Sequence, residues 1–239
     1  MKILALESSA PAASAALWAE GKCVGLYLQN CGLTHSETLL PMAENLLKGC
    51  AAPLGEVDLI AVARGPGSFT GVRIGVATAK GLSWGLDKPC CGVSTLEAMA
   101  WQGAHLEGRL LCCCMDARRG QVYNALFRGT GEGLRRLSED RAVALGELLP
   151  ELTEAPVLLG DGAELAAKAL AEAGMPFTLA PEPLRIQSAW GVALAAARAP
   201  KEAWGEPEPV YLRLSQAERE RLAKLNNNQT SLLDRDKGE

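Results

Sequence analysis

Apolar residues come in short runs at the start of the chain and then change to a helical spacing. Residues 2–6, 14–19 and 23–28 are three such runs, and they predict three strands that form a meander. After them, Thr34 and Glu37 match a capping box, and the apolar residues that follow recur at i, i+3, i+4 and i+7. This spacing predicts an amphipathic helix.

A glycine-rich loop joins the next predicted strand to the next predicted helix. Residues 57–63 are mostly apolar, residues 64–68 read Arg-Gly-Pro-Gly-Ser, and helical composition continues to about Leu86. Ser68 is a good N-cap, and Gly65 and Gly67 permit the backbone angles of a tight turn. Such a turn directs backbone N–H groups outward, where they could receive an anion. The P-loop lysine is absent, which argues against Walker-type catalysis.

The second half of the chain repeats this order of elements. A short strand at residues 89–93 and a helix capped by Ser94 close the first half. A hairpin, a helix, a strand, a helix, a strand and a last helix are predicted at residues 110–127, 143–152, 156–159, 164–173, 177–180 and 187–198. The order predicts an α/β protein with a duplicated ribonuclease-H-like fold of the actin, sugar kinase and Hsp70 type, built on mixed sheets.

We expect two lobes and a tail from this order. Residues 1–105 form the first lobe, residues 106–213 the second, and residues 214–239 a polar tail. Within the tail, residues 216–225 could be helical, and the sequence from Asn226 onward has the composition of a disordered segment.

Composition narrows the possible partners and the compartment. The chain has 239 residues, 48% of them hydrophobic, and its net charge of −4 argues against independent nucleic-acid binding. Neither a signal peptide nor an apolar run long enough for a membrane span is recognisable, so we expect a cytoplasmic protein. The eight cysteines lack CxxC spacing and are interpreted as small buried hydrophobic residues.

The predicted fold prompts two enzymatic hypotheses. A nuclease needs several carboxylates at strand ends, but only Glu7 is well placed, because Arg64 follows the central strand. An ATP-using enzyme would hold phosphates between two hairpin turns, at residues 7–9 and 116–120. Candidate anion or nucleotide contacts are then Glu7, Ser8, Gly67, Ser68 and Arg118, although ordinary hairpin turns explain the same residues equally well.

No catalytic triad or metal cluster can be assembled from the sequence. Its two histidines, His35 and His105, carry no recognisable catalytic motif. A different feature is the stripe of Gly71, Gly75 and Ala79 at four-residue spacing. Such small residues allow another helix to approach closely, or they pack against the chain's own core.

Several of these motifs together closely resemble the bacterial TsaB family, also called YeaZ. They are residues 63–75 (ARGPGSFTGVRIG), residues 92–96 (GVSTL), residues 115–118 (MDAR), residues 121–123 (QVY) and residues 209–213 (PVYLR). The resemblance covers residues 2–213 and is denser in the first half. One departure is Glu7, where the family more often has Asp.

The resemblance implies a part in making threonylcarbamoyladenosine at position 37 of tRNA. TsaB is similar in fold to the catalytic protein TsaD and serves as its non-catalytic partner. TsaD carries a metal-binding pair of histidines where this chain has Thr95 and Met99, so no catalytic residue and no metal site is expected here. The resemblance further implies a complex with the ATPase TsaE, with ATP and a metal ion on partner subunits, contact with tRNA only through the complex, and no membrane.

The family resemblance also implies an interface with TsaD, or with a second copy when TsaD is absent. The two predicted helices that begin near His35 and after the glycine-rich loop would pack in a helical bundle with their equivalents. The interface residues are then His35, Leu39, Leu40, Met42, Leu46, Gly71, Gly75 and Ala79. On this hypothesis, Gly75→Leu weakens pairing and leaves the monomer folded.

One enzymatic alternative remains beside the scaffold hypothesis: an ATP-dependent transferase or hydrolase that acts in its own cleft. A glycoprotein peptidase finds no support in the sequence, which offers neither a metal pair nor an activated nucleophile.

Overall fold

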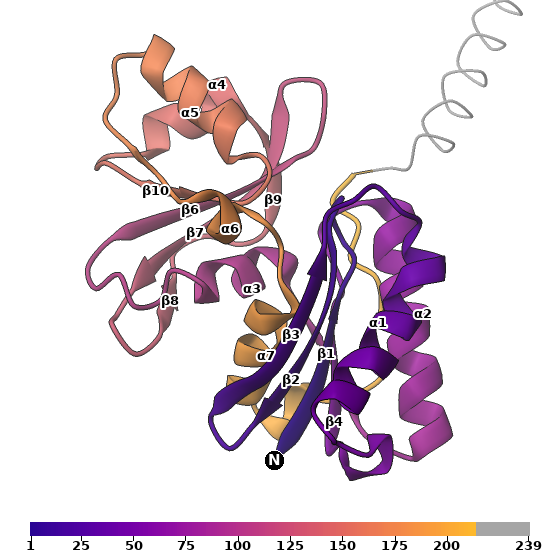
Figure 1. Cartoon of the computed structure of the whole chain (residues 1–239). Coiled ribbons are helices and arrows are strands. Elements are labelled where there is room, and N and C mark those ends of the chain that lie inside the picture. The colour runs from indigo at the N-terminus through magenta and orange to yellow at the C-terminus, as the bar shows by residue number, and fades with distance from the viewer. Residues whose placement is uncertain (214–239) are drawn as a thin grey trace, which may run out of the picture.

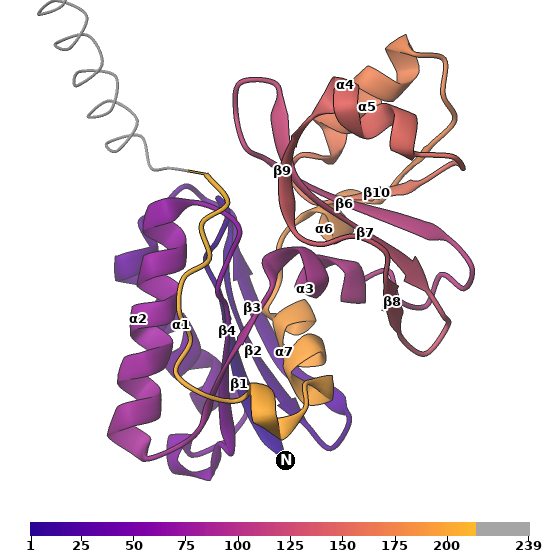
Figure 2. The same ribbon diagram turned by 180° about the vertical axis from the view of Figure 1, so that it is seen from behind.

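The computed structural model describes residues 1–213 as two lobes, each built on one mixed sheet. Figures 1 and 2 show the lobes from opposite sides, with helices packed on the sheet of each. This architecture confirms the predicted duplicated ribonuclease-H-like α/β fold. The predicted helix at residues 216–225 and the predicted disordered tail lie outside the described residues. None of the described helices is long and apolar enough to cross a membrane.

The first sheet has the strand order β3-β2-β1-β4-β5. Its strands are β1 (Lys2–Glu7), β2 (Ala13–Ala19), β3 (Lys22–Gln29), β4 (Leu59–Ala63) and β5 (Cys90–Val93). The first three strands form the predicted antiparallel meander, and β4 and β5 run parallel to β1. The carboxyl ends of β1, β4 and β5 therefore meet at one edge of the sheet.

Two long helices cover one face of this sheet. They are α1 (His35–Gly49) and α2 (Phe69–Leu86), and the short 3-10 turn η1 (Leu54–Glu56) precedes β4. The predicted N-cap of α2 is confirmed, because Ser68 Oγ accepts a hydrogen bond from Gly71 N. The predicted capping box of α1 is wrong. The Thr34 hydroxyl makes no cap hydrogen bond; instead, the backbone oxygen of Thr34 accepts from Glu37 N.

The second sheet has the order β11-β10-β6-β7-β8, with β9 also paired to β7. Its strands are β6 (Leu110–Asp116), β7 (Gln121–Gly129), β8 (Leu134–Arg136), β9 (Arg141–Ala144), β10 (Val157–Leu159) and β11 (Thr178–Leu179). The helix predicted at residues 143–152 is wrong at its start. Residues 141–144 pair with β7 as β9, and only α4 (Leu145–Leu148) and the 3-10 turn η2 (Leu149–Glu151) follow. The short strand β8 carries too little alternation to be recognised in the sequence.

The remaining helices are α3 (Thr95–Trp101), α5 (Ala163–Glu172), α6 (Glu182–Arg185) and α7 (Ala189–Arg198). Of these helices, α3 and α7 connect the two lobes, and α5 and α6 belong to the second lobe. Side chains of α3 join the core of the second sheet, whereas α7, which comes late in the chain, packs on the first sheet and against α3. The strands of the first sheet precede residue 105, the predicted boundary, and those of the second sheet follow it. Helix α7 follows the boundary as well but packs on the first sheet.

The last described residues form a segment that returns along the first lobe. This C-terminal strap, residues 199–213, contains the 3-10 turn η3 (Lys201–Ala203) and runs in yellow beside the first sheet in Figure 2. Tyr211 stacks on Phe69 of α2 at 3.8 Å between ring centroids, and its hydroxyl accepts from Arg73. At the end of the strap, the Arg213 guanidinium donates to the backbone oxygen of Ala117 in the second lobe.

Candidate functional site: the cleft between the lobes

A cavity of about 700 Å³ lies between the two lobes. It is lined by the loop before α2, the turn after β1, the β6–β7 turn and the end of the C-terminal strap. In open α/β sheets, ligands bind beyond the carboxyl ends of the strands. The carboxyl ends of β1 and β6 are marked by Glu7 and Asp116, and Asp161 follows β10. This cleft is therefore the first candidate site.

Glu7 is a fully buried carboxyl group behind the floor of the cleft. Burial raises its pKa to about 7, and the nearby Asp161 carboxylate acts in the same direction. One oxygen, Oε1, accepts from Ser9 N at 2.6 Å, whereas Oε2 is buried with no hydrogen-bond partner. Glu7 therefore changes charge near neutral pH.

The turn after β1 is packed tightly against the glycine-rich loop. Ser8 Oγ donates to Gly71 O at 2.9 Å, and Ser68 N donates to Ser9 O at 2.7 Å. A Cβ on Gly67 would overlap the backbone of Ser9. Ser8 itself is buried. Part of the expected anion cradle is thus already engaged, because the N–H of Ser68 and the hydroxyl of Ser8 are spent on contacts within the chain.

The β6–β7 turn forms the opposite wall of the cleft. Arg118 has a left-handed backbone with φ of 62°, and its N–H donates to Asp116 Oδ1 at 2.7 Å. Its side chain is exposed at the cleft. The carbonyl oxygens of this turn accept from Arg213, which closes one end of the cleft. Arg118 is the predicted contact that remains free to meet a ligand.

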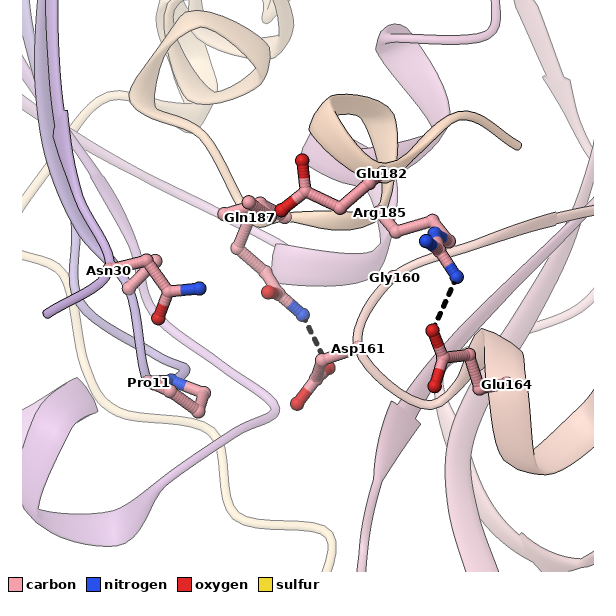
Figure 3. A pocket seen from close by; sticks show the side chains of 10 residues that line it. Pro11, Asn30, Gly160, Asp161, Glu164, Glu182, Arg185 and Gln187 are labelled. Atoms are coloured by element: carbon pink, nitrogen blue, oxygen red, sulfur yellow. Dashed lines mark hydrogen bonds and ion pairs between the residues drawn. The ribbon is translucent and has the colours of Figure 1, made fainter. Parts of the chain in front are cut away.

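Asp161 extends the site on the second lobe. Figure 3 shows the adjoining cavity of about 140 Å³, in which the Gln187 amide points toward Asp161 and Arg185 toward Glu164. Gln187 Nε2 donates to Asp161 Oδ1 at 2.6 Å, and burial raises the pKa of Asp161. Asp161, Gln187 and Arg213 were not among the predicted contacts. The Gly-Asp-Gly turn after a predicted strand was the available signal for Asp161.

The cleft offers polar contacts but little that could activate a nucleophile. In residues 1–213 there is no group of three or more His, Cys, Asp and Glu side chains placed to hold a metal ion. His35, the histidine nearest the cleft, donates from Nε2 to Ala10 O at 2.8 Å and so ties α1 to the turn after β1. A triphosphate fits poorly, because Ser9 N and Ser68 N are engaged and a carboxyl group lies behind them.

The predicted interface residues of α1 divide between the core and the surface. Leu39, Met42 and Leu46 are at most 4% exposed and pack in the core of the first lobe. Their predicted role as anchors for a partner is wrong, because the chain's own sheet already covers them. Leu40 is 41% exposed and remains available, and His35 is half-buried.

The predicted stripe on α2 faces inward. A Cβ on Gly71 would overlap the backbone oxygen of Ser8, and one on Gly75 would overlap the hydroxyl of Ser8. Ala79 is fully buried. These small residues let the turn after β1 approach the helix closely. The prediction that they face a partner helix is therefore wrong, and the core-packing alternative is confirmed.

Thr95 and Met99 lie in the interior of the molecule. Thr95 is fully buried, and its hydroxyl makes no hydrogen bond among the residues described. Met99 packs in the core of the second lobe, where its sulfur accepts from Gln187 Nε2 at 3.6 Å. These two side chains supply one hydroxyl and one thioether facing packed neighbours.

The fold and the cleft define the class first: this is a two-lobed protein of the actin, sugar kinase and Hsp70 type. A family model described as TsaD, tRNA N6-adenosine threonylcarbamoyltransferase, matches residues 29–220. The chain belongs to this family and, within it, to the TsaB or YeaZ proteins.

Individual relatives agree with this assignment. The chain is 40% identical to the tRNA threonylcarbamoyladenosine biosynthesis protein TsaB of Bacillus subtilis (strain 168), over 64% of this chain and 67% of that protein. It is also 40% identical to the protein of the same name from Escherichia coli (strain K12), over 63% and 65%. The solved YeaZ from Pseudomonas aeruginosa superposes with a TM-score of 0.69 at 27% identity, over 88% of this chain and 99% of that one. The two sequence alignments thus span about two thirds of each relative.

Proposed function

We propose that this chain is a non-catalytic subunit in the formation of threonylcarbamoyladenosine at position 37 of tRNA, and that it binds and activates TsaD. The observation that carries the proposal is its 40% identity to proteins named for this pathway as TsaB. The chemistry of the cleft supports the non-catalytic part. Its best-placed donors are spent on internal hydrogen bonds, and a hydroxyl and a thioether stand where the resemblance to TsaD calls for metal-binding histidines.

The outer surface of α2 is the better candidate for the TsaD interface. Ala77, Gly81 and Trp84 follow one another at i, i+4 and i+7, and all three are exposed. A Cβ on Gly81 would meet nothing within 4 Å, and the Trp84 side chain is 92% exposed. We call these three residues the outer stripe. Small residues allow a partner helix to come close, and an exposed tryptophan is a typical anchor of an interface.

Leu40 is a further exposed apolar side chain, on the neighbouring helix α1. Helices α1 and α2 lie side by side on the same face of the first sheet in both views. Leu40 is exposed on α1 next to Pro41, which is exposed as well. The interface we propose therefore keeps the two predicted helices but uses their outward residues. The same surface would pair two copies of this chain when TsaD is absent.

The other subunits supply what this chain lacks. In the proposed assembly, TsaE joins at the junction with TsaD, ATP and a metal ion belong to the partner subunits, and tRNA is reached only through the complex. This chain needs no cofactor of its own.

A transfer assay tests the proposal. Threonylcarbamoyl transfer to tRNA would be measured with TsaD and TsaE of the same organism, fed with threonylcarbamoyl adenylate, with and without this chain. We expect transfer only when the chain is added, and none from the chain alone. Transfer that proceeds equally well without it would contradict the proposal. Trp84→Ala serves as the matched variant, which should fold normally and fail to restore transfer.

The cleft supports one alternative, an ATP-dependent transferase or hydrolase. The observation in its favour is the cavity of about 700 Å³, which Asp116, Arg118 and Asp161 line. A carboxyl group that faces a cavity can serve as a general acid or base. Calorimetric titration with ATP and magnesium separates the two functions. Micromolar binding with turnover that Asp161→Asn abolishes would favour the enzyme, and the absence of heat would favour the scaffold.

A further inference from the structure

A second cavity, of about 580 Å³, lies on the other side of the glycine-rich loop. Gly65 lines this cavity, whereas Gly67 and Ser68 of the same loop line the cleft between the lobes. Its walls come from the carboxyl ends of β4 and β5, from α3 and α7, from the loop before β9 and from the C-terminal strap. Helices α3 and α7 lie side by side in Figure 2. The cavity has the size and position of a small-molecule site.

The acidic wall of this cavity is held in place by Arg136. Arg136 donates to Asp140 at 2.7 Å and to Glu97 at 3.1 Å. Ser94 Oγ donates to the other oxygen of Asp140 at 2.5 Å. Arg136 thus pairs with two carboxylates, and Asp140 has the Ser94 hydroxyl as a second donor. These acidic groups are held in place, and Arg136 offsets part of their charge.

Two further arginines line the cavity without a carboxylate partner. Neither Arg64 nor Arg198 takes part in an ion pair within residues 1–213. Glu139 is the one lining carboxylate not paired with Arg136, and it lies beyond ion-pair distance of both. Apart from Arg136 and its two partners, the charged groups that line the cavity are two guanidinium groups and one carboxylate.

Both arginines are exposed, and each contacts the wall of the cavity. The Arg198 guanidinium carbon lies 4.3 Å from the ring centroid of Trp101, and Nη1 donates to Leu194 O at 3.3 Å. The stem of Arg64 passes over Gly92, where an added Cβ would come within 2.9 Å of Arg64 Cδ. Trp101 also lines the cavity, and its indole N–H is buried without an acceptor. The two guanidinium groups are therefore donors that no carboxylate within residues 1–213 engages.

We propose that this cavity binds a small phosphate monoester through Arg64 and Arg198. A guanidinium group presents a planar set of donors that matches the oxygens of phosphate, and two such groups can pair with one phosphate from two sides. The volume leaves room for an organic part of up to nucleotide size. The ring of Trp101, already covered by Arg198, supplies an apolar wall for that part.

Calorimetric titration of the isolated chain tests this site with two probes, inorganic phosphate and adenosine 5′-monophosphate. We expect saturable binding that weakens about tenfold or more in Arg64→Gln and in Arg198→Gln, the loss of one charge-assisted pair. Arg64→Lys, which keeps the charge and loses the planar fork, should fall between. Arg118→Gln is the matched control, because Arg118 lies in the cleft between the lobes. Thermal melts verify that each variant is folded.

The possible outcomes separate clearly. Tighter binding of the nucleotide than of phosphate would assign the organic part to the cavity, and equal binding would assign the anion alone. Absence of saturable binding up to high millimolar phosphate overturns the proposal. So does binding that survives both Arg64→Gln and Arg198→Gln, or that is lost in Arg118→Gln. Because TsaD is absent from the titration, its failure would leave the proposed pairing with TsaD unaffected.

Discussion

Helix α2 carries small residues on two opposite faces, and the surroundings of the two faces differ. On the inner face, Gly71 and Gly75 touch Ser8 so closely that a Cβ on either would overlap it. On the outer face, Ala77 and Gly81 are exposed, and nothing lies within 4 Å of a Cβ on Gly81. Contacts within the chain thus explain the glycines of the inner face, whereas no contact within residues 1–213 explains Gly81.

The difference shows where a partner should be sought. A glycine inside a helix costs roughly 1 kcal/mol relative to alanine. On the inner face this cost is offset by close packing on the turn after β1. On the outer face no contact within residues 1–213 offsets it for Gly81. An exposed glycine beside the 92% exposed Trp84 therefore suggests contacts that form only in a complex.

The largest effect is expected for Gly75→Leu. The new side chain would overlap Ser8 Oγ, which is held by Gly71 O, and would press on Val62 in the core. Overpacking of this kind costs about 3 kcal/mol or more. Urea unfolding should show the loss, and Gly81→Leu is the matched control, because its side chain has open space. Equal stability of Gly75→Leu and the natural sequence would mean that the inner face is not packed as described.

This expectation replaces the one drawn from the sequence. There, Gly75→Leu was predicted to weaken pairing in a folded monomer. Because Gly75 is buried against Ser8, its replacement should destabilise the monomer itself. Gly81→Leu is the substitution that should weaken pairing with TsaD while leaving the chain folded.

A second test concerns the buried carboxyl group beside the inner face. The pKa of Glu7 is raised by burial from 4.5 to about 7, so between these values the folded chain binds more protons than the unfolded one. The contribution of Glu7 is therefore fully present below pH 4.5 and is lost as the pH rises to about 7. The total loss is about 3 kcal/mol at 1.36 kcal/mol per pKa unit.

Glu7→Gln isolates this contribution. The amide cannot ionise, so the variant should match the natural chain near pH 4.5 and exceed it by up to about 3 kcal/mol at pH 8. The measurement is the free energy of unfolding of both chains across this range. Asp161→Asn is the control for the neighbouring acid, which contributes to the raised pKa of Glu7. A constant difference between Glu7→Gln and the natural chain would show that Glu7 does not titrate there.

The outer stripe gives the third effect. Trp84→Ala should weaken binding to TsaD by about 2 kcal/mol, roughly thirtyfold, as for an anchor residue at the centre of an interface. Its melting temperature should not change, because the side chain is almost fully exposed. Leu165→Ala, which removes another exposed apolar side chain on α5 of the second lobe, is the control. A dissociation constant unaffected by Trp84→Ala would place the interface elsewhere.

The sequence predicted the elements of the first lobe far better than those of the second. Its strands and its two long helices have strong apolar periodicity, and Ser68 and Ser94 mark two helix starts by their side chains. In the second lobe, residues 141–144 lie in a strand because β7 pairs with them, a tertiary contact that local pattern does not encode. The crossing of α7 to the first sheet is likewise a long-range packing choice.

The sequence predicted which two turns lie at the cleft, but it did not predict the contacts that their residues make. The two turns that carry Glu7 and Arg118 do face one cleft, because each follows the first strand of its own sheet and the cavity lies between the two lobes there. Periodicity also identified the buried stripe on α2, but it could not tell which neighbour the stripe packs against. The close approach of Ser8 follows from how the turn after β1 folds back. Arg213 reaches the second lobe across 96 residues of sequence, a distance beyond any local signal.

The smallest effect is expected for Gly81→Ala, which tests whether a partner helix packs closely on the outer stripe. The added methyl meets open space in the isolated chain, so the helix should gain up to about 1 kcal/mol in free energy of unfolding. If a partner helix packs on the outer stripe, the same methyl occupies the space that close approach requires, and binding to TsaD should weaken. Opposite signs for stability and for affinity, measured by urea unfolding and by titration, are the result we expect. A gain in stability with unchanged affinity would instead mean that the partner helix does not come close at Gly81, and Trp84 alone would then anchor the interface.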